Sequence, residues 1–132
     1  MSMLAVPIGR PTFDVDHGVD QVRSALELLR SRHADVTAIS PGIDGGLFTD
    51  DSSLIEALDR VVAAADPIDV VMVLQGTFCD SSMIAAIADR LDVPIVVWSF
   101  PEARTGGRLR LNSLCGANLA AYVLRRRGDV AE

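Results

Sequence analysis

Four short apolar segments alternate with four amphipathic segments along this chain of 132 residues. The clearest apolar segment is Asp69–Gln75, where five consecutive apolar residues indicate a strand buried on both faces, as in a parallel sheet. Single helices between successive strands predict right-handed β-α-β units within one parallel sheet. We therefore predict an α/β fold: a Rossmann-like (flavodoxin-like) four-stranded parallel sheet in the order 2-1-3-4, with helices on both faces.

The bounds of these elements follow from apolar periodicity, helix caps and turn residues. The other strands are expected at Leu4–Ile8, Asp35–Ser40 and Pro94–Phe100. The helices are expected from Asp16 or His17 to Ser31, from an Asp50 or Asp51 cap to Pro67, after Asp80 or Ser81, and from an Asn112 cap to Gly128. We predict one domain over residues 1–128 and a disordered tail over residues 129–132.

Two strands in this scheme are unusual. Pro7 lacks an N–H donor, so the first strand should be less regular than the others or lie near an edge. The fourth strand, rich in valine and isoleucine and containing Trp98, would form an apolar edge, which is an association hazard. We expect further chain or a partner to cover it, and so we expect these residues to be part of something larger.

Composition narrows the classes of function. The net charge of −6 argues against binding to nucleic acid or to an anionic membrane surface. The two cysteines and two histidines are scattered and lack metal-ligand spacing. No apolar run is long enough to span a bilayer, so we expect a reduced, cytoplasmic protein. Cys79 has no histidine partner and is a weak nucleophile candidate, and Cys115 is expected to be buried.

Chemistry is expected at the turns that follow the strands, because ligands of open α/β sheets bind beyond the carboxyl ends of the strands. Arg10 follows the first strand and could donate to a hydroxylated or anionic ligand. The alternative is an ion pair with Asp14 or Asp16.

The turn after the third strand holds Gln75, Thr77 and Phe78. An amide, a hydroxyl and an aromatic ring together suit a polyol, because they offer hydrogen bonds to hydroxyls and a flat surface to C–H groups. In the alternative, Gln75 satisfies backbone groups at the end of the strand and Phe78 belongs to the core.

The turn after the fourth strand carries Arg104, Arg108 and Arg110 around the Gly106–Gly107 pair. These arginines could hold an anion. Alternatively, they pair with Glu102 and nearby aspartates and brace the turn against a neighbouring domain or subunit. The glycine spacing does not match a dinucleotide-binding fingerprint.

Three segments together resemble the amino-terminal domain of the L-fucose/L-arabinose isomerase family, and the resemblance covers nearly the whole chain. They are Pro7–Asp14, with sequence PIGRPTFD, Val73–Phe78, with sequence VLQGTF, and Pro101–Asn118, with sequence PEARTGGRLRLNSLCGAN. The last segment is the most distinctive.

The resemblance implies an aldose–ketose isomerase that uses a divalent metal, usually Mn²⁺, held by later domains. It implies that this domain helps to recognise the sugar within a homo-oligomer, that Arg10 resembles the family's sugar-binding arginine, and that residues 76–79 overhang the sugar. Thr77 and Phe78 stand where some members carry tryptophan. We therefore expect a substrate-recognition and assembly domain that lacks a metal site and does not turn over sugar alone. A stand-alone module that binds a sugar or anion is the alternative, ahead of a flavin or nucleotide binder.

Overall fold

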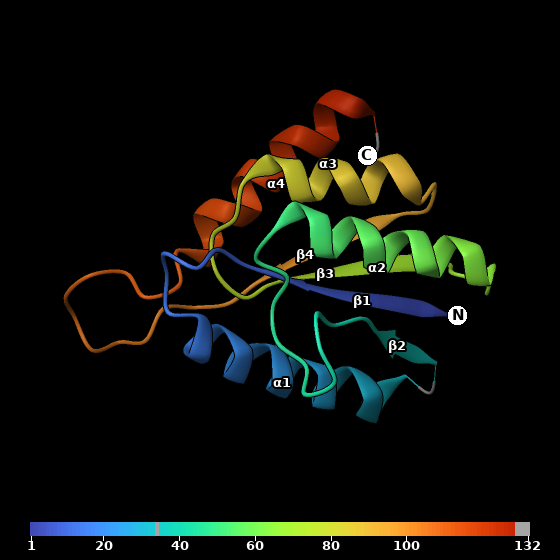
Figure 1. The fold of residues 1–132 in the computed structure, drawn as a ribbon. Helices are drawn as coiled ribbons and strands as arrows, with labels where there is room; N and C mark the ends of the chain where they lie inside the picture. The colour runs from blue at the N-terminus through green and yellow to red at the C-terminus, as the bar shows by residue number, and fades with distance from the viewer. Residues whose placement is uncertain (34, 129–132) are drawn as a thin grey trace.

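Strands and helices alternate strictly through residues 1–33 and 35–128, which are the residues that the computed structural model describes (Figure 1). The elements are β1 (Met3–Ile8), α1 (Val15–Arg32), β2 (Val36–Ala38), α2 (Asp51–Ala64), β3 (Val70–Gln75), α3 (Ser81–Arg90), β4 (Ile95–Ser99) and α4 (Ser113–Arg127). The predicted tail at residues 129–132 lies outside the described residues, and the boundary of the domain at residue 128 stays a prediction.

The sheet is parallel throughout and has the order β2-β1-β3-β4, so the predicted fold class and strand order are confirmed. Strands β1 and β3 form its centre and pair over six residues each, from Met3 opposite Val70 to Ile8 opposite Gln75. All six residues of β1 are buried, which a parallel sheet covered on both faces requires.

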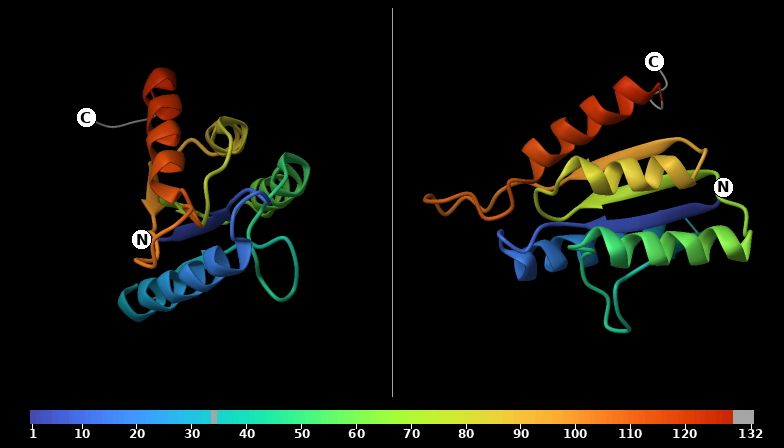
Figure 2. Two further views of the ribbon diagram at one scale, coloured as in Figure 1. Left: turned by 90° about the vertical axis from the view of Figure 1, so that its left-hand side faces the viewer. Right: turned by 45° about the horizontal axis from the view of Figure 1, so that its top comes forward.

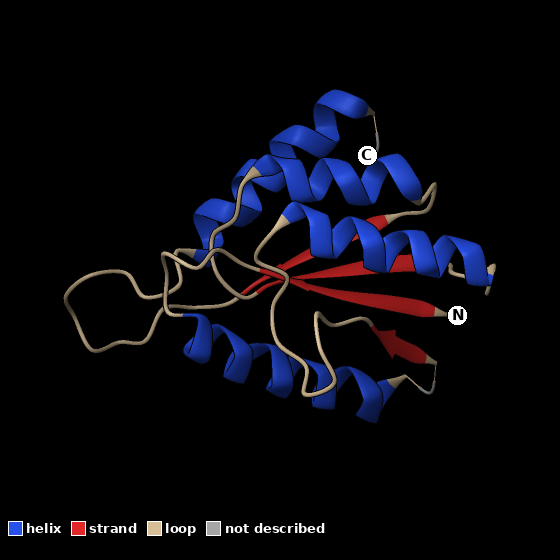
Figure 3. Ribbon diagram, viewed as in Figure 1, coloured by secondary structure: helices blue, strands red, loops and turns tan. Residues whose placement is uncertain are grey.

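Helices cover both faces of the sheet, but unequally (Figures 2 and 3). Helices α2, α3 and α4 share one core cluster with Leu4, Val6 and Val73. Helix α1 covers the opposite face and packs with Met3, Ala5 and Leu74. None of the helices within the described residues is long and apolar enough to cross a membrane.

Pro7 lies in a regular strand between β2 and β3, so the expectation of a less regular strand is wrong, whereas the expectation of a nearby edge holds at Pro7 itself. The structure shows why proline is tolerated there. The pairing of β2 with β1 ends at Ala38 opposite Ala5. The carbonyl of Pro7 faces that side and accepts a hydrogen bond from the N–H of Phe48 at 3.0 Å. The missing N–H of Pro7 therefore falls where β2 has already ended.

Helix starts follow the predicted chemistry only in part. Of the two caps expected for α2, Asp50 is the one that the structure shows, through a hydrogen bond from the N–H of Ser53. Helix α1 starts at Val15, one or two residues earlier than predicted, and Asp14 caps it by accepting from the N–H of His17. Asn112 occupies the N-cap position of α4, as predicted, but its backbone is left-handed, with φ of 50°, and its side chain makes no capping bond.

Candidate functional site at the carboxyl edge of the sheet

The turns that follow the strands meet at the carboxyl edge of the sheet. The N–H of Arg10 donates to the hydroxyl of Thr77 at 2.7 Å, which joins the turn after β1 to the turn after β3. The N–H of Phe78 donates to the carbonyl of Leu111 at 2.8 Å, which adds the segment before α4. The N–H of Gly9 donates to the carbonyl of Phe48. Hydrogen bonds of the backbone N–H groups therefore bring together the turns that follow all four strands.

Arg10 lies at this edge with its side chain 43% exposed, and it forms an ion pair with Asp80 across 3.3 Å. The predicted alternative partners were Asp14 and Asp16. Asp14 is instead engaged by Arg110, at 2.6 Å. Arg10 keeps guanidinium N–H groups for a ligand, but Asp80 compensates its positive charge.

Phe13 and Phe78 form a small aromatic surface beside Arg10. Their ring centroids are 6.0 Å apart and their planes are tilted by 53°, and both rings are partly exposed. The N–H of Phe13 donates to the carbonyl of Arg10, which fixes the backbone of Phe13 in the same turn. We call Arg10, Phe13, Phe78 and Asp80 the rim.

Gln75 and Thr77 lie beneath the rim and are fully buried. The amide of Gln75 donates to the carbonyl of Thr77 at 3.1 Å and contacts Sγ of Cys79 at 3.2 Å. The Thr77 hydroxyl accepts from Arg10 and donates to the carbonyl of Phe78. This arrangement favours the alternative in which Gln75 satisfies backbone groups at the strand end, because both side chains bond within the turn.

Helix α4 supplies two contacts that the sequence did not suggest. The hydroxyl of Ser113 donates to the carbonyl of Gln75 and accepts from the N–H of Phe100, so it ties the ends of β3 and β4 together. Gly116 lies against the Gln75 side chain, and a Cβ there would stand 2.4 Å from Nε2. The sequence pattern predicted an Asn112 cap at the start of α4. It carried no signal for the contacts that Ser113 and Gly116 make with Gln75.

The two cysteines have opposite environments. Cys79 is buried, and burial raises the pKa of its thiol to about 12, which leaves it uncharged near neutral pH. A buried, uncharged thiol does not favour nucleophilic attack. Cys115 is exposed, so the expectation that it is buried is wrong.

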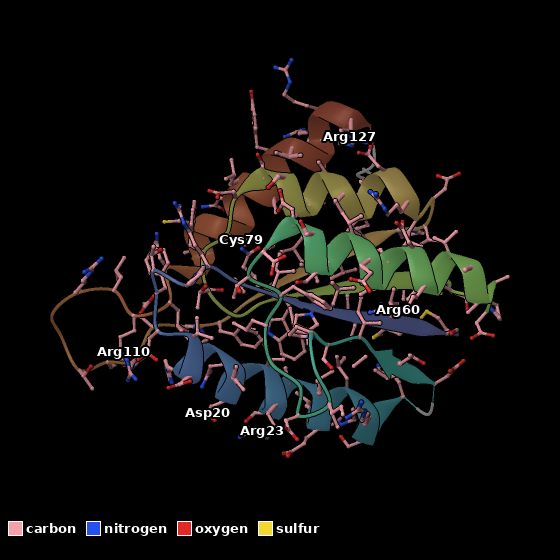
Figure 4. All side chains as sticks on the ribbon, in the orientation of Figure 1. Asp20, Arg23, Arg60, Cys79, Arg110 and Arg127 are labelled. Atoms are coloured by element: carbon pink, nitrogen blue, oxygen red, sulfur yellow. The ribbon has the colours of Figure 1, made fainter. Side chains whose placement is uncertain are left out.

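The segment after β4 forms a projecting arm, which we define as residues 103–109 (Figures 1 and 4). Its root is fixed by Glu102, whose carboxylate accepts from the backbone N–H groups of Arg110, Leu111 and Asn112. Burial acts to raise the pKa of Glu102, but these three donors outweigh it and hold the pKa below its ordinary value. The guanidinium of Arg110 adds an ion pair with Asp14.

The predicted arginines of this segment thus have different roles. Arg110 braces the root, as the pairing alternative predicted, and Figure 4 labels it beside the start of α1. The hydrogen bond from His17 and that from Arg110 lower the pKa of Asp14, so this carboxylate stays charged at neutral pH. Arg104 and Arg108 are exposed, and neither makes a hydrogen bond or ion pair with another described residue.

A metal site is not evident within residues 1–33 and 35–128, where no group of three or more His, Cys, Asp or Glu side chains could hold an ion. The residues described here therefore do not fit a Mn²⁺ centre of their own.

Comparison with known proteins assigns the family. Residues 5–131 match the family described as "Fucose/sulfoquinovose isomerase, N-terminal domain". A sulfoquinovose isomerase of Alkalicoccus urumqiensis is 37% identical over 125 residues, which are 95% of this chain and 26% of the relative. That of Priestia aryabhattai is 35% identical over 124 residues, which are 94% of this chain and 26% of the relative.

The chain thus spans about a quarter (26%) of the length of these curated relatives, and the shared region begins at β1 and runs through α4. The predicted resemblance to the fucose isomerase group is confirmed. This chain belongs to the fucose/sulfoquinovose isomerase family, whose N-terminal domain it matches.

Proposed function

We propose that this chain is the substrate-recognition and assembly domain of a metal-dependent aldose–ketose isomerase that acts on sulfoquinovose, a sulfonated 6-deoxyhexose. The observation that carries the proposal is the rim: a half-exposed guanidinium and two aromatic rings on turns that hydrogen bonds join, at the edge of the sheet where ligands of such folds bind. The names of the relatives support the choice of sugar.

In this proposal Arg10 donates to sugar hydroxyls and Phe78, supported by Phe13, lies against the C–H face of the sugar. Asp80 orients the guanidinium and leaves the rim without a strong net charge, which suits a hydroxyl better than an anion. Gln75 and Thr77 hold the turn beneath these groups, so their part in recognition is to position Phe78 and Arg10.

The metal belongs to residues other than those described here. A divalent ion such as Mn²⁺ would polarise the carbonyl and hydroxyl of the sugar during isomerisation. We also propose that the protein works as a homo-oligomer in the cytoplasm. The two free cysteines support a reducing compartment, and the apolar edge at β4 supports association.

The test uses the product of the whole open reading frame that encodes this chain. With Mn²⁺ it should convert sulfoquinovose to its ketose, followed by NMR, and a chelator should abolish the conversion. The 132-residue chain with Mn²⁺ and sulfoquinovose, L-fucose or L-arabinose should form no ketose, because its described residues offer no metal site. Binding of sugar by the whole product without isomerisation would instead establish the stand-alone binding module.

Arg10→Ala tests the role of the rim. Loss of a charge-assisted hydrogen bond should raise KM by about tenfold or more. Arg23→Ala is the matched control, because Arg23 is also an exposed arginine paired with an aspartate, Asp20, but lies on α1 away from the rim. Equal kinetics for the Arg10 and Arg23 variants would remove Arg10 from the site.

A further inference from the structure

The arm is the strongest feature that the proposed function leaves unused. It projects from the carboxyl edge beyond the body of the molecule, as the views in Figures 1 and 2 agree. Arg104 and Arg108 lie on it as exposed cations without a described partner, on a chain whose net charge is −6. Arg10 and Arg110 at the same edge are each paired with an aspartate. The charge of the arm is therefore uncompensated.

The root of the arm is held beside the rim. The N–H of Asp14 donates to the carbonyl of Arg110, and the N–H of Phe78 donates to the carbonyl of Leu111. Together with the three N–H groups on Glu102, these bonds anchor the arm next to Phe78.

The tip of the arm is open. Gly106 and Gly107 have φ of 71° and 81°, a left-handed backbone that favours glycine, and no heavy atom lies within 4 Å of the place that a Cβ would occupy on either. The root is thus fixed by hydrogen bonds, while space surrounds the segment between the two arginines.

The chemistry of an unpaired arginine matches the group that distinguishes sulfoquinovose from a common hexose. A sulfonate is ionised at all physiological pH values and presents three oxygen acceptors. A guanidinium binds such an oxyanion through two parallel N–H donors. Arg10 is less suited to this task, because Asp80 already neutralises it.

We propose that Arg104 and Arg108 form the subsite that binds the sulfonate of the substrate. This inference rests on the proposed function, since it requires a sulfonated sugar. The rim then binds the neutral part of the sugar, and the arm selects for the anion.

The test compares two substrates of the whole isomerase, sulfoquinovose and 6-deoxyglucose, which differ only in the sulfonate. Arg104→Ala and Arg108→Ala should each raise KM for sulfoquinovose by about tenfold, and the double variant by more, because each removes charge-assisted hydrogen bonds. The kcat/KM for 6-deoxyglucose should change less than about twofold. Arg30→Ala/Arg32→Ala is the matched control: it removes the same charge from exposed positions on α1, so it reports general electrostatic steering.

The outcomes separate this inference from the proposed function. If the unaltered enzyme does not isomerise sulfoquinovose, both are overturned. If it does, but the arm variants impair both sugars equally or neither, only the arm assignment is overturned. Leu109, which is 52% exposed, is the arm residue that a protein partner would bury. If Leu109→Ala and the arginine variants all dissociate the assembly, the arm is a subunit contact and the sulfonate assignment is wrong.

Discussion

Three contacts at the carboxyl edge of the sheet involve a single residue, Gln75, at the end of β3. Its amide lies between the carbonyl of Thr77 and the sulfur of Cys79, and its backbone carbonyl accepts the Ser113 hydroxyl. Its Oε1 is buried and has no partner among the described residues. A buried acceptor without a partner costs free energy, so the contacts of Nε2 and the close approach of Gly116 must hold the side chain in place.

Gly116→Ala should therefore destabilise the fold. The new Cβ would stand 2.4 Å from Nε2 of Gln75 and 3.2 Å from the Cα of Phe78, and Gln75 is too enclosed to move aside. We expect the free energy of unfolding in urea to fall by about 1–3 kcal/mol, more than offsetting the helix propensity that alanine adds. Gly42→Ala is the control, since nothing lies within 4 Å of its Cβ position. Equal stability of the two variants would contradict this packing.

At the scale of elements, the root of the arm is the feature with the clearest pH dependence. Glu102 satisfies three backbone N–H groups that precede α4, and those donors keep its pKa below the ordinary value of 4.5. The unfolded chain binds the proton more readily than the folded chain. The stabilisation is therefore fully present above the ordinary value and is lost as pH falls through the lower folded-state pKa.

Glu102→Gln should lower the free energy of unfolding by about 1–2 kcal/mol at pH 7, because a neutral amide accepts fewer and weaker hydrogen bonds. The difference from the unaltered protein should shrink as pH falls below 4.5. Urea titrations across that range measure it. The control is Glu27→Gln, the same chemical change at an exposed position on α1. A difference that stays constant down to the acid limit would show that the charge of Glu102 is not responsible.

Local signals predicted the elements well, because periodicity and caps act between neighbours in sequence. The five apolar residues before Gln75 indicated β3, and the cap of α2 was narrowed to Asp50 or Asp51, of which Asp50 makes the capping bond. The site was harder to predict, since its contacts join distant residues: Arg10 with Asp80, and Arg110 with Asp14. The parallel topology predicts that the turns lie close together. Which carboxylate each arginine pairs with depends on three-dimensional geometry that no local sequence pattern encodes.

At the scale of the whole molecule, β4 forms the longer of the two edges of the sheet. Strand β4 (Ile95–Ser99) pairs with β3 within the described residues, and it carries no charged side chain. Helix α4 packs on β4, yet Val96 remains 46% exposed. Edge strands of this kind usually carry charges or a covering segment that prevents pairing with other chains. The unpaired edge is thus the part of this domain best suited to contact a second copy.

The 132-residue chain should consequently self-associate with rising concentration, and Val96→Lys should shift it to monomer by placing a charge on the edge strand. Val62→Lys is the matched control, because Val62 on α2 is 49% exposed and lies away from the edge. Sedimentation velocity measures the populations, and circular dichroism checks that both variants keep the fold. Equal loss of self-association in both variants would indicate a general effect of charge, since the net charge of −6 becomes less negative in each. A chain that stays monomeric at its highest attainable concentration would show that β4 does not drive association by itself.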